Sequence, residues 1–317
     1  MNLERLWYSN KNFFSLALLP LAGLYCLVVK IRQQAYKRQW ISSKKFPVPI
    51  IVVGNITVGG TGKTPLVIWL AKFLKKQGFN VGIISRGYGG SSKSWPQAVF
   101  PDSDPLLVGD EPVLIARNSG CPVAVAPKRS LAVEYLLDKY NCNLIISDDG
   151  LQHYALKRDI EIAVVDAKRR YGNGLCLPAG PLREPLSRLK AVDWIIHKGI
   201  ELEYEIQELR RVSDDQIVTA LANQKVHAIA AIGNPAGFFQ LLRQYGLILD
   251  CHKFRDHHIY TENDILFDDD LPVIMTEKDA VKCKKFAKQQ HLYLPITAKL
   301  PESFTAQINK KLFITQV

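Results

Sequence analysis

The sequence lacks any cysteine pattern that would indicate a disulfide framework or a zinc site. Its six cysteines are scattered over 317 residues, with no Cys-x-x-Cys pair and no Cys/His cluster at metal-binding spacing. This pattern argues against a zinc finger and indicates a reducing compartment. The sequence also has no internal repeat, no low-complexity tract and no basic segment interleaved with stacking aromatics. Nucleic acid is therefore not predicted as a partner.

Acidic residues are few relative to basic ones. Lys and Arg number 41 against 30 Asp and Glu, which gives a net charge of +11. Such a surplus favours an acidic lipid or a phosphorylated substrate as a partner, although a basic surface also serves solubility. The length allows one or two domains.

Charge is absent from residues 13–29, which read FFSLALLPLAGLYCLVV, a run of 17 residues. This is the short end of what spans a bilayer. Four basic residues follow, Lys30, Arg32, Lys37 and Arg38, which predicts that the rest of the chain lies in the cytoplasm. A cleaved signal peptide would carry its basic residues before the apolar run.

Three interpretations of this N-terminal segment, residues 1–40, stay open. It is a single-span anchor, a buried core helix, or a helix lying in the membrane interface. In the last case, four aromatic residues would sit at headgroup depth: Trp7, Tyr8, Tyr36 and Trp40.

From residue 47 onward the pattern becomes that of an α/β protein. Short apolar runs end in glycine, proline or aspartate, and helical patterns lie between some of them. The runs are PIIVVGN, NVGIISRGYGG, PVAVAP, NLIISDDG and IEIAVVD. This alternation predicts a parallel sheet with helices on both faces. After TPLVIWLAKFLKKQG, Gly78 is predicted to end a helix.

A change of composition marks a second domain. Residues 200–225 are rich in charge, and a new strand–helix pattern then begins at KVHAIAAIGNPAGFFQ. We therefore expect a core domain over residues 41–221 and a smaller α/β domain over 222–317 that closes over a cleft.

Residues 54–65, GNITVGGTGKTP, follow the first predicted strand and open a helix, which is the setting of a phosphate-binding loop. Glycines there let backbone N–H groups surround phosphate oxygens, and the helix N-terminus favours an anion. Lys63 is expected to reach the β- and γ-phosphates, and the Thr64 hydroxyl to ligate Mg²⁺. The predicted nucleotide-binding residues are Gly59, Gly60, Thr61, Gly62, Lys63, Thr64 and Arg86.

The loop departs from the standard phosphate-loop pattern, because Thr57 stands where the first glycine is expected. It is closer to the loop of partition-type ATPases, but Val58 stands where those proteins carry a lysine. Farther on, SDDGLQH follows an apolar strand and supplies Asp148 and Asp149. Carboxylates at this edge of the sheet are placed to hold Mg²⁺, and either of them is a candidate ligand.

The chain as a whole resembles the tetraacyldisaccharide 4'-kinase family. The resemblance runs from the apolar N-terminus to about residue 280. It rests on VGNITVGGTGKTP, SRGYGG, VGDEP, SDDGLQH, LPAGPLREP, FRDHH and TEKDAVK, in that order. It implies a P-loop NTPase-like fold and a kinase of lipid A biosynthesis that uses ATP and Mg²⁺. The substrate would be the 4'-hydroxyl of a tetraacylated glucosamine disaccharide 1-phosphate, at the cytoplasmic face of the bacterial inner membrane. No obligate protein partner is evident.

The resemblance also implies roles for individual residues. Asp110 in VGDEP is the expected catalytic carboxylate, and His257 in FRDHH its partner, with the adjacent His258 as the alternative. Arg183 and Glu184 in LPAGPLREP are expected to contact the substrate. Arg86 is a candidate for binding a phosphate of the nucleotide or the substrate, because guanidinium suits phosphate recognition.

Three other classes fit the sequence less well. A membrane-associated partition-type regulatory ATPase predicts a lysine at Val58 and leaves VGDEP and FRDHH without a role. A GTP-dependent insertion protein or metallochaperone predicts an Asn-Lys-x-Asp motif and a metal-binding cluster, and neither pattern is found. A soluble small-molecule kinase leaves the apolar N-terminus unexplained.

Overall fold

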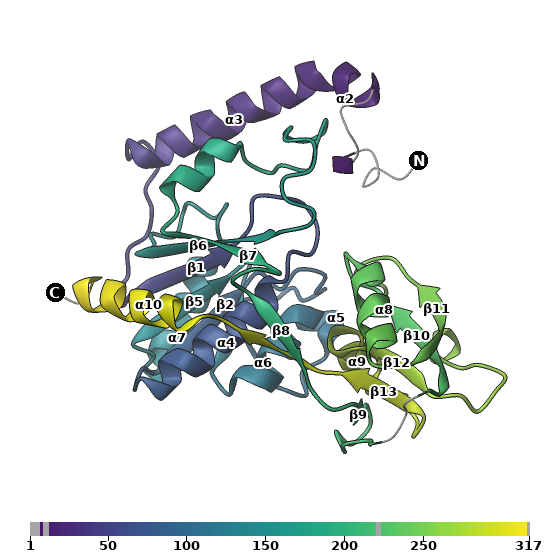
Figure 1. Ribbon diagram of the computed structural model, residues 1–317. Coiled ribbons are helices and arrows are strands. Elements are labelled where there is room, and N and C mark those ends of the chain that lie inside the picture. The colour runs from purple at the N-terminus through teal and green to yellow at the C-terminus, as the bar shows by residue number, and fades with distance from the viewer. Residues whose placement is uncertain (1–6, 9–12, 220–222, 316–317) are drawn as a thin grey trace.

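The structure, a computed structural model, describes residues 7–8, 13–219 and 223–315. Within these residues the chain forms two lobes, each built around a mostly parallel sheet, with a long N-terminal helix lying across the larger lobe (Figure 1). We call the part around the seven-stranded sheet the large lobe and the part around the five-stranded sheet the small lobe.

The sheet of the large lobe has the strand order β3-β4-β2-β5-β1-β6-β7. Every neighbouring pair is parallel except β3 with β4. The strands are β1 (Ile50–Gly54), β2 (Val81–Ser85), β3 (Gln97–Val99), β4 (Val123–Val125), β5 (Leu144–Asp148), β6 (Ile160–Asp166) and β7 (Trp194–Lys198). Because β1 lies beside β5, with Val53 paired to Asp148, the loops that follow these two strands open at the same edge of the sheet.

Helices cover both faces of this sheet, because successive side chains along a strand point into two different hydrophobic clusters. Ile51 and Val53 of β1 pack in one hydrophobic cluster with helices α4 (Lys63–Lys76) and α6 (Asp110–Ser119). The neighbouring Ile50 and Val52 pack in the other cluster, with α7 (Arg129–Tyr140). The expected parallel sheet with helices on both faces is thus confirmed. Gly78 follows α4 with φ +90°, as a helix-ending glycine should.

The small lobe has its own sheet, in the order β11-β10-β12-β13-β9. Its strands are β9 (Arg210–Arg211), β10 (Lys225–Ala230), β11 (Ile248–Lys253), β12 (Val273–Thr276) and β13 (His291–Leu294). Helix α8 (Pro235–Gln244) packs on one face of the sheet and α9 (Glu277–Cys283) on the other, each over a separate hydrophobic cluster. The remaining short elements are α5 (Pro105–Val108) and the 3-10 helices η1 (Leu186–Ala191) and η2 (Glu262–Asp264).

A two-stranded antiparallel ribbon joins the lobes. It pairs β8 (Glu203–Ile206) with β14 (Ile296–Lys299), and Figure 1 shows it running between the two sheets. After β14 the chain returns to the large lobe, where α10 (Glu302–Thr315) packs into the core through Phe304 and Ile308. The boundary expected at residue 222 lies outside the described residues, and the division into 41–221 and 222–317 stays a prediction.

The N-terminal segment forms two helices, α2 (Phe13–Ala17) and α3 (Leu19–Lys37). Helix α3 packs on the large lobe through Tyr25 and Cys26, but much of its apolar surface is exposed, so it is not a buried core helix. The exposed apolar residues of the two helices are Phe13, Phe14, Leu16, Leu19, Leu21, Leu24, Leu27, Val28 and Ile31. In the described part of the chain, no helix combines the length and the apolar character that crossing a membrane requires.

The aromatic residues expected at headgroup depth differ in their surroundings. The Trp7 indole N–H donates to the carbonyl of Pro178 at 3.0 Å, and the Arg169 guanidinium lies 4.7 Å from the centre of the Tyr8 ring. Tyr36 stacks on Tyr154 with 5.8 Å between ring centres. Trp40, by contrast, is 69% exposed. All four side chains therefore contact the protein, and the contact of the exposed Trp40 is with the Arg38 guanidinium, 5.4 Å from the ring centre.

Candidate active site

The two lobes form the walls of one large cleft, with a volume of about 1560 Å³. The large lobe contributes the phosphate loop, Arg86, Asp149 and Arg183 to its lining, and the small lobe contributes His257 and Lys278. Most of the site residues predicted from the sequence thus face one space. A cleft walled by two lobes is a common place for a ligand site.

The phosphate loop lies between β1 and α4, and its glycines are required by its geometry. Gly59 and Gly62 have φ of +100° and +83°, a region that costs other residues about 1–2 kcal/mol. A Cβ atom on Gly62 would lie 1.9 Å from the Tyr204 hydroxyl. Gly60 contacts Gly233 of the small lobe. A Cβ atom on Gly233 would lie 2.7 Å from the Gly60 nitrogen. Gly59 and Gly62 are therefore required as glycines, and they let the backbone of the loop approach a phosphate closely.

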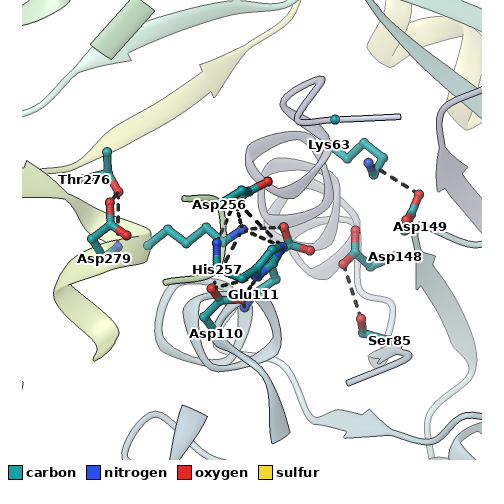
Figure 2. A network of polar contacts seen from close by, with 12 residues as sticks. Lys63, Ser85, Asp110, Glu111, Asp148, Asp149, Asp256, His257, Thr276 and Asp279 are labelled. Carbon is teal, nitrogen blue, oxygen red and sulfur yellow. Dashed lines mark hydrogen bonds and ion pairs between the residues drawn. The ribbon is translucent and has the colours of Figure 1, made fainter. Parts of the chain in front are cut away.

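Lys63, the first residue of α4, points to Asp149, which follows β5 in the same lobe (Figure 2). Its Nζ lies 3.4 Å from Asp149 Oδ1, and Arg183 Nη1 lies 3.1 Å from Asp149 Oδ2. Burial raises the pKa of Asp149, but the charges of Lys63 and Arg183 outweigh it and lower that pKa to about 2. Two cations thus meet one carboxylate beside the phosphate loop, which leaves positive charge available for an anion.

Asp148 has the environment of a metal ligand. Its side chain is buried, and Oδ1 has no hydrogen-bond partner, while Ser85 donates to Oδ2 at 3.4 Å. Burial and the nearby charges of Glu111 and Asp149 raise the pKa of Asp148 to about 7. A buried carboxylate with a free oxygen among other carboxylates favours a hard cation, so these residues fit Mg²⁺. Glu111, which the sequence reasoning missed, belongs to this group of acids.

Asp110 and His257 meet across the cleft, although 147 residues separate them in the sequence. Asp110 opens α6 and is 5% exposed. Its carboxylate accepts a hydrogen bond from His257 Nδ1, at 3.1 Å to Oδ2 and 3.2 Å to Oδ1. His258 instead contacts Asp264, with 3.3 Å between Nε2 and Oδ2. Of the two histidines considered from the sequence, His257 is the one beside Asp110.

The charges around this pair decide its protonation. Burial alone would raise the pKa of Asp110. The hydrogen bond from His257 and the charge of Lys278 outweigh burial and lower this pKa to about 2. The same hydrogen bond raises the pKa of His257, against the opposing effects of burial and Lys278. His257 also has a left-handed backbone, with φ +60°. Such strain is typical of residues held in place for function.

Lys278, a second residue that the sequence reasoning missed, holds this acidic group together. Its Nζ lies 3.0 Å from Glu111, 3.6 Å from Asp256 and 3.9 Å from Asp110. It follows the strand β12 in the TEKDAVK motif. The alternating charges of this motif do not show which side chains face the cleft. The nearby Asp279 has a structural role, because it accepts hydrogen bonds from the Thr276 hydroxyl and the Ala231 amide, at 2.7 and 3.0 Å. Figure 2 shows the acidic residues Asp110, Glu111 and Asp256 around His257, and Asp279 beside Thr276.

Glu184 lies in the loop through which the N-terminal helix contacts the large lobe beside the cleft. Its buried carboxylate accepts hydrogen bonds from Gln33 of α3 at 2.8 Å, from Gln152 at 2.9 Å and from the Tyr154 hydroxyl. The Tyr25 hydroxyl of α3 donates to the carbonyl of Arg183 at 2.9 Å. Helix α3 therefore fixes the position of the loop that holds Arg183 against Asp149.

Arg86 is exposed on the wall of the cleft. Among the described residues, no hydrogen bond or ion pair engages its guanidinium. The buried Arg129, which the sequence reasoning also missed, donates to the carbonyls of Asp148 and Asp149, at 3.1 Å each. It thereby holds the backbone at the end of β5.

Three comparisons agree on what the chain is similar to. The family model described as tetraacyldisaccharide-1-P 4'-kinase matches residues 14–313. A tetraacyldisaccharide 4'-kinase of Nitrosococcus oceani is 51% identical over 96% of this chain and 92% of its own length. One of Hahella chejuensis is 48% identical over 98% of this chain and 96% of its own length.

A solved structure resembles the fold as well. It is described as the "apo" form of LpxK from Aquifex aeolicus in complex with ATP, at 29% identity and a TM-score of 0.80. The match covers 95% of this chain and 100% of that one. The similarity therefore includes both lobes and the cleft between them.

Proposed function

The chain belongs to the tetraacyldisaccharide-1-P 4'-kinase family, and from this premise we propose how its residues carry out the reaction. It is a lipid sugar kinase of lipid A biosynthesis, which transfers the γ-phosphate of ATP to the 4'-hydroxyl of a tetraacylated disaccharide. The partition-type ATPase is not favoured. The observation that carries the proposed mechanism is the Asp110–His257 contact beside the phosphate loop.

We assign the phosphates to the cradle of Gly59, Gly60, Thr61 and Gly62, with Lys63 neutralising the transferred group. In phosphoryl transfer the protein mainly positions the groups and stabilises charge. Lys63 would exchange Asp149 for phosphate oxygens when ATP binds, because the phosphates carry more charge than one carboxylate. The exposed Arg86 would contact a phosphate of the nucleotide or the substrate.

We propose that Asp110 accepts the proton of the sugar hydroxyl. With a pKa near 2, it is ionised at neutral pH and a weak base. That suffices for a loose transition state, in which the attacking hydroxyl loses its proton late. His257 keeps the carboxylate oriented and ionised. Lys278, at 3.5 Å from His257 Nε2, holds the histidine in turn.

We propose Mg²⁺ as the metal that accompanies ATP, held by Thr64, Asp148 or Asp149, and Glu111. The unpartnered Oδ1 of buried Asp148 and its raised pKa support this assignment. When bound, the ion would neutralise charge on the phosphates. The protein residues orient the nucleotide. Arg183, which lines the cleft, would contact the sugar headgroup, and the buried Glu184 would act only by holding the loop that carries Arg183.

We further propose that α2 and α3 bring the enzyme to the inner-membrane surface. Their exposed apolar face lies beside exposed basic residues, Lys30, Arg32, Lys37 and Arg38. Each basic residue near an anionic surface contributes about 1 kcal/mol. The same helix contacts the Arg183–Glu184 loop, so the membrane-facing and cleft-facing parts of the protein are coupled.

The kinase assignment is tested by following label from γ-labelled ATP into lipid. The full chain is incubated in detergent with Mg²⁺ and the tetraacylated disaccharide 1-phosphate, and lipids are separated by thin-layer chromatography. We expect labelled lipid with the wild type and none with Lys63→Ala. ATP turnover without labelled lipid would contradict the assignment and return the regulatory ATPase to consideration.

The membrane proposal has a separate test. We expect vesicles containing phosphatidylglycerol to sediment the wild type but less of a Leu24→Asp, Val28→Asp variant, because two exposed apolar contacts are lost. Ile200→Asp is the matched control, since Ile200 is also exposed but lies on the β7–β8 turn. Equal loss of binding in both proteins would contradict a docking face on α3.

A further inference from the structure

The small lobe places three metal-ligating side chains on one face of a strand pair, away from the phosphate loop. His227 on β10 is the register partner of Asp250 on β11, and His252 is two residues farther along β11. Since side chains alternate along a strand, Asp250 and His252 lie on the same face, with His227 opposite Asp250. Residues from two strands thus meet, which is why sequence spacing gave no sign of a metal site.

The atoms of this cluster are spaced like ligands of one metal ion. His227 Nδ1 and His252 Nε2 are 3.0 Å apart. Asp250 places one oxygen 3.7 Å from His227 Nδ1 and the other 3.7 Å from His252 Nε2, and one atom from each residue fits within 4.8 Å. Tetrahedral Zn²⁺, with bonds near 2.0–2.1 Å, needs ligand atoms about 3.3 Å apart.

Hydrogen bonding within the cluster accounts for only part of this arrangement. It joins His227 Nδ1 to His252 Nε2 but does not include Asp250. At 3.7 Å, neither imidazole nitrogen is hydrogen-bonded to Asp250. In the part of the chain that the structure describes, no donor forms a hydrogen bond to the Asp250 carboxylate. Two ring nitrogens and a carboxylate therefore face a common point, where a cation would satisfy all three.

A second layer of contacts orients His227. Its other ring nitrogen, Nε2, lies 3.1 Å from Asp269 Oδ1. The ring stacks on Phe267, with 3.7 Å between ring centres and 14° between planes. A carboxylate on the far nitrogen fixes the tautomer in which Nδ1 carries the lone pair. That lone pair accepts a hydrogen bond from His252 without metal and would ligate an ion instead, an arrangement typical of metal-binding histidines.

We propose that His227, Asp250 and His252 bind a divalent transition metal of the Zn²⁺ class, with Asp269 as the positioning carboxylate. Two imidazoles and one carboxylate select Zn²⁺, Ni²⁺ or Cu²⁺ over Mg²⁺. Asp250 and His252 are 49% and 30% exposed, so water completes the coordination. The ion clamps the edge strand β11 to β10, just before the turn that carries Asp256 and His257. The site is independent of the kinase reaction proposed above.

The test measures Zn²⁺ binding by equilibrium dialysis of the metal-free full chain, without nucleotide and with excess Mg²⁺ to occupy the carboxylates of the cleft. We expect His252→Ala to bind one Zn²⁺ fewer than the wild type. Asp269→Asn should retain the site but weaken it about 10- to 100-fold. His197→Ala is the matched control, because it removes a histidine of the large lobe. Equal Zn²⁺ binding by the wild type and His252→Ala would overturn the proposal.

A second measurement uses the wild type alone, so it does not depend on whether a variant folds. Co²⁺ added to the wild type in the same buffer should give the visible absorption bands of a four-coordinate site with nitrogen ligands. Addition of Zn²⁺ should then abolish the bands by displacement. A spectrum indistinguishable from that of hydrated Co²⁺ would overturn the proposal on its own.

Discussion

Replacing Lys278 tests whether one largely buried lysine, with 14% of its side chain exposed, holds the acidic side of the cleft together. Its Nζ lies 3.0, 3.6 and 3.9 Å from three carboxylates. At an effective dielectric constant of about 20, each contact is worth about 4–6 kcal/mol before desolvation. Desolvation offsets much of this sum, and removing one partner of a buried ion pair costs about 3–5 kcal/mol. We therefore expect Lys278→Met to lower the free energy of unfolding by about 3–5 kcal/mol.

Lys285→Met is the matched control. Lys285 lies only 2.7 Å from Asp104, but its side chain is 69% exposed against 14% for Lys278. Exposed pairs contribute about 0–1 kcal/mol, so this variant should lose little despite the shorter distance. Urea unfolding followed by circular dichroism, without Mg²⁺ or nucleotide, gives both values. A loss of less than about 1 kcal/mol in Lys278→Met, the range of an exposed pair, would show that Lys278 does not hold these carboxylates together.

Three further predictions follow from single residues. Gly62→Ala should abolish ATP binding measured by calorimetry, because the added Cβ atom would collide with the Tyr204 hydroxyl. Gly78→Ala is the control: its φ is equally unfavourable, but the space around its Cβ atom is open, so this variant should bind ATP normally. The stability difference between the wild type and His257→Gln should be full below about pH 6.5 and shrink as the pH rises, because the folded-state pKa of His257 is raised; a flat difference would contradict the ion pair. Glu184→Gln should lower stability by about 1–3 kcal/mol, because its amide would face donors, and should speed hydrogen exchange in α3; unchanged exchange would contradict the link to Gln33.

The sequence predicts those parts of the fold and the site that depend on neighbours along the chain. The strand–loop–helix around Lys63 is such a part, because the apolar run, the glycines and the helical pattern are consecutive. The strand ending at Asp148 is another. Both carry their own local signals of burial and turn formation.

Contacts between distant segments leave no such signal. The Asp110–His257 contact was expected only from the resemblance to a family, since 147 residues separate the two. Lys278 and Glu111 were missed because a charged residue on a helix is usually solvated, and only the packing of the lobes brings these two together and partly shields them. The return of α10 to the large lobe likewise depends on tertiary packing that an amphipathic pattern cannot assign to one surface.

Asp110→Asn tests the proposed catalytic pair most directly, because it keeps the shape of the side chain and removes its negative charge. We expect this variant to bind ATP with wild-type affinity in calorimetry but to transfer label into lipid about 10²- to 10⁴-fold more slowly, the usual contribution of a general base. Phosphorylation of the lipid at close to the wild-type rate would contradict the central role given to Asp110.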